Sequence, residues 1–206
     1  MQERLYAATL TVIGRLQPQG DGRHFTVTTP DGGEFTVKMR GFKRRNLKPE
    51  QIDVPLELHI WPRTDREGRL QPGSQLYKLR PAEAPRNHLS VTGRLIYYEP
   101  NEPRVAVLIR RNQQGNLLNE FAVSARVAGS AVAAMPRPLP RNVQPMRGVA
   151  LTGHLEGDRL VVTGVEHVNL AEAKPLKERR RRPKHLRPPR ERKPGAAAAT
   201  TEAAGA

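Results

Sequence analysis

Leu10-Thr11-Val12-Ile13-Gly14-Arg15-Leu16 is a seven-residue stretch that returns 79 residues later as Leu89-Ser90-Val91-Thr92-Gly93-Arg94-Leu95. Five of the seven positions are identical, and leucine and valine alternate with threonine, serine or isoleucine. This period of two predicts a β-strand that turns one face to a core. The glycine at the same place in both copies indicates a bulge or a sharp bend. We therefore predict a duplicated small β-domain.

The composition of the 206-residue chain limits what it can form. Aromatic residues make up only 4%, so valine, leucine and isoleucine must fill the cores, and 19 prolines with 17 glycines leave no room for long helices. The absence of cysteine excludes disulfides and thiolate metal sites and is typical of a cytoplasmic protein. Residues 1–6 lack the apolar segment of a signal peptide, and no stretch approaches a membrane span. We expect a soluble protein with no membrane partner.

Positive charge is the strongest compositional feature, with a net charge of +15 at pH 7. Residues 174–194 hold eleven lysines and arginines against two glutamates, whereas residues 1–173 hold 24 against 17 acidic residues. This excess predicts a polyanionic partner, with nucleic acid first and an anionic membrane surface second.

Each copy of the motif is followed by further alternating segments in the same order. The expected strands are 10–16, 24–28, 34–39, 54–61 and 75–79, and then 89–98, 104–110, 120–123, 149–154 and 159–168. Three strands, a variable insertion and two more strands resemble the OB-fold, a small five-stranded Greek-key barrel. An SH3-like barrel is the alternative. We expect an all-β protein of two tandem five-stranded OB-like barrels followed by a disordered basic tail.

The predicted domain boundaries follow from these segments. The first barrel spans residues 1–80, a proline-rich linker spans 81–87, and the second barrel spans 88–169. Residues 170–206 form the tail, which is rich in arginine and proline and then in alanine.

Residues that could support catalysis are scattered. The six histidines form no helical pair and have no cysteine partner. Asp31, Glu34 and Lys38 resemble the acidic-plus-lysine cluster of some nucleases, but their spacing is wrong and Asp31 lies in a Gly-Gly hairpin. The sequence contains no phosphate-binding glycine loop or nucleophile elbow. We expect no enzymatic activity, no cofactor and no metal.

The resemblance to OB-folds implies that single-stranded nucleic acid lies across the second and third strands, between the loops that join strands one to two and four to five. Such a site needs cations for phosphates and rings on which bases stack. Trp61 is the best candidate for an exposed ring, while Phe35 and Phe121 are expected in the cores and one of Tyr97 and Tyr98 must face outward. The candidate cations are Arg23, Lys38, Arg40, Lys43, Arg44, Arg45 and Lys48 in the first copy and Arg104, Arg110 and Arg111 in the second.

The tail differs in kind from the barrels. Its like charges repel and its prolines prevent a continuous helix, so we expect an extended, disordered segment that binds phosphates without reading sequence. A nuclear localisation signal is the alternative for a eukaryotic source. The candidate contacts are Arg179, Arg180, Arg181, Arg182, Lys184, Arg187, Arg190, Arg192 and Lys193.

Two hypotheses of function result. The first is a non-catalytic protein that prefers single-stranded RNA or DNA through its barrels, with the tail adding contacts to any phosphate backbone. The second is a structural or adaptor protein whose barrels bind protein and whose tail docks on a ribonucleoprotein such as the ribosome. In either case we expect a cytoplasmic location, free or associated with the nucleoid or with ribosomes. The second copy has the weaker basic run and is the one expected to have lost binding.

Overall fold

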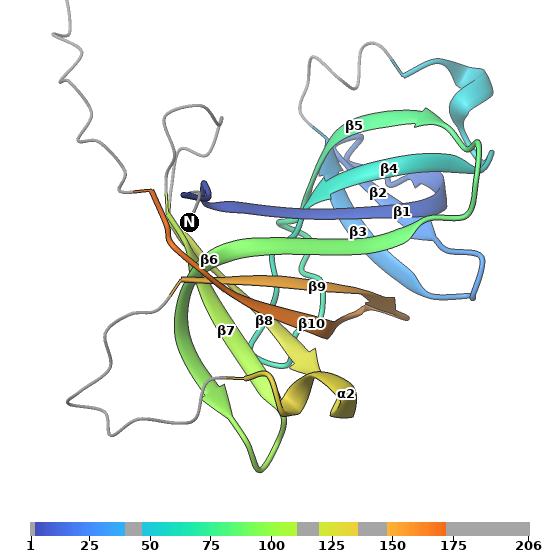
Figure 1. Cartoon of the computed structure of the whole chain (residues 1–206). Helices are drawn as coiled ribbons and strands as arrows, with labels where there is room; N and C mark the ends of the chain where they lie inside the picture. Colours follow the sequence, from blue (N-terminus) through green and yellow to red (C-terminus); the bar gives the residue numbers. More distant parts are fainter. Residues whose placement is uncertain (1–2, 40–46, 111–119, 136–147, 172–206) are drawn as a thin grey trace, which may run out of the picture. The chain divides into compact units, whose positions relative to one another are not determined.

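The computed structural model describes residues 3–39, 47–110, 120–135 and 148–171, and most of these residues lie in β-strands (Figure 1). The strands of the first copy are β1 (Ala7–Pro18), β2 (His24–Thr28), β3 (Glu34–Met39), β4 (Leu56–Trp61) and β5 (Gln75–Pro81). Those of the second copy are β6 (Asn87–Glu99), β7 (Arg104–Ile109), β8 (Phe121–Val127), β9 (Gly148–Glu156) and β10 (Arg159–Val168). Two short helical turns, η1 (Pro49–Gln51) and α2 (Gly129–Val132), follow β3 and β8.

Hydrogen bonds close the strands of each copy into a circuit. In the first copy the order is β1-β2-β3-β5-β4, and β4 returns to β1. The second copy repeats it as β6-β7-β8-β10-β9, with β9 returning to β6. Among these pairs, β3–β5 and β8–β10 are parallel and the others antiparallel. This is the Greek-key order of the OB-fold, which confirms the predicted fold class, and we call the two circuits barrel one and barrel two.

The two copies of the repeated motif lie side by side. β1 pairs with β6 in antiparallel register, and Leu10 stands opposite Leu89, the equivalent residue of the second copy. Both side chains are fully buried. This pairing joins the barrels through one continuous sheet, and residues Met1–Lys174 form one compact unit. The boundaries at 80, 87 and 169 stay a prediction.

The repeated glycine marks the point where the first strand of each barrel changes partner. β1 pairs with β4 as far as Gly14 and with β2 from Arg15 onward. A Cβ atom at Gly14 would lie 2.7 Å from Cγ1 of Val27, and one at Gly93 would lie 2.5 Å from the carbonyl oxygen of Leu108. Because both distances are shorter than van der Waals contact, a larger residue at either position forces a neighbouring group to shift. The predicted bulge or bend at these glycines stays a prediction.

Candidate functional site

The loop between β1 and β2 is held by a single carboxylate. Asp21 Oδ1 accepts hydrogen bonds from the backbone amides of Arg23 (2.9 Å) and His24 (3.0 Å), and its Oδ2 contacts the His24 ring. These hydrogen bonds hold the pKa of Asp21 well below its usual range, and the bond from the His24 amide has the largest effect. The turn fixes the start of β2, and the side chain of Arg23 stays exposed beside it.

The outer face of β2 and β3 is polar. Phe25 and Phe35 point into the core and are 3% and 6% exposed. On the outside Thr26 pairs with Thr36, and Gln19 Nε2 donates to both hydroxyls at 3.1 and 3.2 Å. No phenylalanine, tyrosine or tryptophan of these two strands faces outward, so the stacking surface that OB-folds place here has no such ring in barrel one.

One end of this face continues as a row of outward side chains across four strands. His24 of β2 stands opposite Lys38 of β3, Lys38 opposite Gln75 of β5, and Gln75 opposite Trp61 of β4. Neighbouring strands are about 4.8 Å apart, so the backbones at Lys38 and Trp61 are separated by roughly 10 Å. We call these four residues the cross-strand row. It brings together three of the predicted elements, since Arg23 precedes it, Lys38 lies in it and Trp61 ends it.

The ring of Trp61 does not stand alone. It is half-buried and stacks on Tyr77 of β5, with ring centroids 4.7 Å apart and planes 18° from parallel. The ring of His59 is 6.0 Å from that of Tyr77 and tilted by 55°. Trp61 is therefore the edge of a small aromatic cluster on the outer face of β4 and β5.

The other predicted cations of the first copy have varied settings. Lys48 is exposed, precedes η1 and pairs with Glu50 at 3.6 Å. The remaining four lie outside the described residues: Arg40, Lys43, Arg44 and Arg45.

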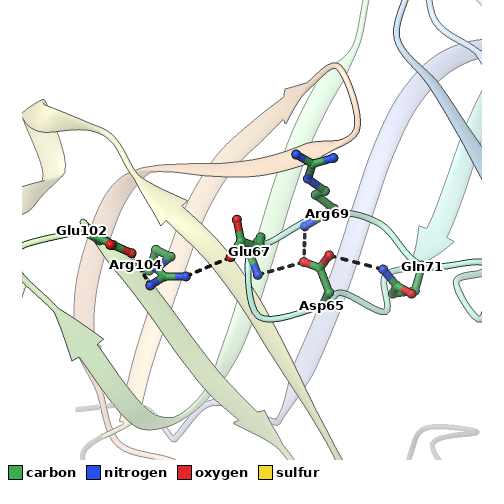
Figure 2. A network of polar contacts seen from close by, with 6 residues as sticks. All are labelled: Asp65, Glu67, Arg69, Gln71, Glu102 and Arg104. Atoms are coloured by element: carbon green, nitrogen blue, oxygen red, sulfur yellow. Dashed lines mark hydrogen bonds and ion pairs between the residues drawn. The ribbon is translucent and has the colours of Figure 1, made fainter.

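The loop between β4 and β5 (residues 62–74) reaches barrel two. Its tip is shaped by Asp65, whose Oδ1 accepts the backbone amides of Glu67 (2.8 Å) and Arg69 (2.9 Å), while Gln71 Nε2 lies 3.5 Å from Oδ2 (Figure 2). Leu70 follows the turn and is buried. In Figure 2 the loop carries these residues alongside the strands of barrel two.

Hydrogen bonds donated by backbone amides fix this loop between β8 and β10. The amide of Ser124 in β8 donates to Thr64 Oγ1 at 2.7 Å. On the other side, the amide of Leu160 donates to the carbonyl of Gly68 at 3.0 Å, and the amide of Leu70 donates to Asp158 at 2.8 Å. The loop thereby occupies the gap that β8 and β10 leave where they are not paired.

Side chains extend the contact over β7 and β8. The guanidinium carbon of Arg63 lies 3.3 Å from the ring centroid of Phe121, and burial lowers the pKa of Arg63. Ala106 and Ser124 pair across the outer face of these strands, yet they are only 2% and 7% exposed. In barrel two, the loop thus covers the centre of the face that carries ligands in OB-folds, while Ala122 and Arg126 of β8 stay exposed at its edges.

The predicted cations of the second copy are paired with acids. Arg104 NH1 lies 3.3 Å from Glu67 of the loop, and its NH2 contacts Glu102 (Figure 2). Arg110 Nε lies 3.4 Å from Glu120. Arg111 lies outside the described residues, as do all the predicted tail contacts from Arg179 to Lys193. Of Tyr97 and Tyr98, the first is exposed and the second packs against the core, so one faces outward as the alternation predicts.

Sequence reasoning missed the ring partner of Trp61 and the docking of the β4–β5 loop. A signal for the loop exists, because it is 13 residues long and the equivalent turn in barrel two consists of Gly157 and Asp158 alone. Long loops inside small domains commonly carry a function. Among the described residues no group of three or more metal-binding side chains is found, and none of the helices there is long and apolar enough to cross a membrane.

Comparison with known proteins adds little to this geometry. No family model matches the sequence, and no curated protein does. Among solved structures, the chain is similar to a deletion mutant of the single-stranded DNA binding protein from Thermus aquaticus, at 15% identity and a TM-score of 0.44. The alignment covers 82% of this chain and 98% of that one. At this TM-score the likeness carries no weight, and the strand order itself identifies the fold.

Proposed function

We propose that the chain binds one single strand of RNA or DNA through barrel one, without catalysis, and that barrel two is a platform for the β4–β5 loop. The cross-strand row carries the proposal. It sets an exposed lysine, an amide and a ring side by side, and a single strand needs cations for its phosphates and rings for its unpaired bases. Arg23 adds a second exposed cation at the start of the row.

Barrel two supports the proposal by contrast. The loop covers the centre of its β7–β8 face, and the carboxylates of Glu67, Glu102 and Glu120 pair with Arg104 and Arg110. A cation paired in this way neutralises a phosphate less well, because it must first give up its partner. The expected binding capacity is therefore one strand per chain.

The basic tail has a separate role in the proposal. Each lysine or arginine that neutralises a phosphate releases a counterion. The resulting affinity falls steeply as the salt concentration rises and does not depend on the nucleotide sequence. The tail would thus hold any nucleic acid near the barrels, while barrel one selects single strands. A cytoplasmic location, free or with the nucleoid or ribosomes, belongs to the same proposal.

The experiment measures binding to single-stranded DNA, single-stranded RNA and duplex DNA over a salt series. Three proteins are compared: the full chain, a chain ending at Lys174, and the full chain with Arg179–Arg182 changed to alanine. We expect the alanine variant to bind all three nucleic acids more weakly, with a salt slope for single strands lower by up to about 3. The chain ending at Lys174 should keep a preference for single strands at moderate salt.

The opposite result would overturn the role of barrel one. If the chain ending at Lys174 binds none of the three nucleic acids while the full chain binds all of them, only the tail contacts nucleic acid. The adaptor hypothesis, in which the barrels bind protein, would then replace the proposal.

A further inference from the structure

The outer face of β4 and β5 contains an irregularity that places two consecutive side chains on the same side. Ile60 pairs with Leu76 and His59 pairs with Lys78, so Tyr77 is an extra residue with no partner in β4. At such a bulge the alternation of β5 is interrupted. Tyr77 and Lys78 therefore both face outward, next to Trp61 and His59.

The ring of His59 on this face is held by two polar groups. His59 Nε2 lies 2.8 Å from Oε1 of Glu57, and its Nδ1 lies 3.3 Å from the hydroxyl of Thr11. With His59 fixed in this way, Tyr77 has its ring against Trp61 and near His59. A rigid, partly exposed pair of rings offers a stacking platform without the entropy loss of ordering it on binding.

The charge around the rings is positive. Lys78 and Arg80 are exposed on β5. The acid of the same face, Glu57, is only 6% exposed and is held by His59 and by Arg86, whose Nε lies 3.3 Å from Oε2. In the register of β4 and β5, Arg80 stands opposite Glu57 and Lys78 stands opposite His59.

We infer that this β4–β5 surface, formed by Trp61, Tyr77, Lys78 and Arg80, is the base-stacking site of the chain for single-stranded nucleic acid. The inference rests on the proposed function and deepens it. Tyr77 supplies a second ring, and Lys78 and Arg80 bind the phosphates that flank the stacked bases. A single-stranded nucleic acid that contacts Arg23 and Lys38 passes over Gln75 to reach this β4–β5 surface. The site thus lies on β4 and β5, beside the face of β2 and β3 on which no phenylalanine, tyrosine or tryptophan points outward.

The competing explanation is that the two rings merely stabilise the sheet, since cross-strand aromatic pairs do so. Fluorescence separates the two because Trp61 is the only tryptophan of the chain. The full chain is titrated with a single strand of about 15 nucleotides, within the usual reach of one OB-fold. Emission of Trp61 and affinity are followed together at moderate salt.

Charge reversal provides the second readout. The variant K78E/R80E changes the proposed site, and R66E/R126E is the matched control, with the same change in net charge at exposed residues of the loop tip and of β8. We expect binding to quench Trp61, K78E/R80E to lose about tenfold or more in affinity, and the control to lose about twofold. Thermal unfolding of both variants checks that each is folded at the temperature of the titration, since R80E places a carboxylate opposite Glu57.

Two outcomes would overturn the inference. In the first, the strand binds at full affinity with no change in Trp61 emission. In the second, the two double variants lose affinity equally, which means that only overall charge matters. Both leave single-strand binding intact and thus differ from failure of the proposed function, in which the chain ending at Lys174 binds no strand at all.

Discussion

Barrel one and barrel two share a strand order but differ in the connection between their fourth and fifth strands. Barrel one uses 13 residues there, whereas barrel two uses the turn at Gly157 and Asp158. The longer loop leaves its own barrel and fills the gap between β8 and β10. The loop thus covers the centre of the β7–β8 face of the neighbouring barrel. It begins and ends beside Trp61 and Gln75 of its own barrel.

The largest difference in stability is expected at the repeated glycine. Gly93→Ala places a methyl group against the backbone oxygen of Leu108, whereas Gly14→Ala meets the more adaptable side chain of Val27. We expect Gly93→Ala to cost about 3 kcal/mol and Gly14→Ala about 1 kcal/mol in the free energy of unfolding. Urea denaturation measures both. Equal losses would show that the two bends are equally tolerant.

Ring removal should affect binding in barrel one alone. Trp61→Ala removes a stacking surface, so we expect about tenfold or greater loss of affinity for single strands and little change for duplex DNA. Tyr97→Ala removes the exposed ring of barrel two and should leave both affinities unchanged. Fluorescence anisotropy with labelled strands measures them. A larger effect from Tyr97→Ala would transfer the binding role to barrel two.

The loop contact is tested by its carboxylate. Asp65→Ala removes the acceptor of the Glu67 and Arg69 amides, and we expect a loss of about 2 kcal/mol in the free energy of unfolding. Glu67→Gln removes only the ion pair with Arg104. Because the Glu67 side chain is 57% exposed, this change should cost less than about 1 kcal/mol in the free energy of unfolding. Urea denaturation compares the two. If both variants are equally stable, the turn at Asp65 does not hold the loop on barrel two.

The smallest effect concerns pH and the loop between β1 and β2. The pKa of Asp21 is lower in the folded chain than in the unfolded one, chiefly because of hydrogen bonds from the backbone of His24 and Arg23. Its contribution to stability is therefore complete above about pH 4, the unfolded pKa, and is lost as the pH falls toward the folded value. Asp21→Asn should reduce the loss of stability between neutral and acidic pH. Unfolding curves at several pH values would contradict this if the variant and the natural chain lose stability in parallel.

Much of the fold could be predicted because it depends on local patterns. Period-two alternation locates all ten strands, and the repeated motif identifies the duplication. β8 extends beyond the predicted strand 120–123 to Val127, because Arg126 and Val127 pair with β10. This extension depends on a tertiary contact with a distant strand, which the local pattern does not encode.

The site was predictable only in part, for a geometric reason. Lys38 and Trp61 could be named from the sequence, but their place in one row depends on the register of β3, β5 and β4. The bulge that turns Tyr77 toward Trp61 interrupts the alternation on which the prediction relied. The docking of the β4–β5 loop depends on contacts between residues 60 positions apart, such as Thr64 and Ser124, and no local pattern encodes them.

If only barrel one binds, each chain holds a single nucleic-acid strand, and counting the bound nucleic-acid strands distinguishes one site from two. The chain ending at Lys174 is saturated with a single strand of about eight nucleotides, short enough for one OB-fold, and the complex is weighed by native mass spectrometry. We predict one nucleic-acid strand per chain, and a clearly smaller bound fraction after Trp61→Ala at the same concentrations. Two bound strands per chain, or a bound fraction that Trp61→Ala leaves unchanged, would contradict the proposal.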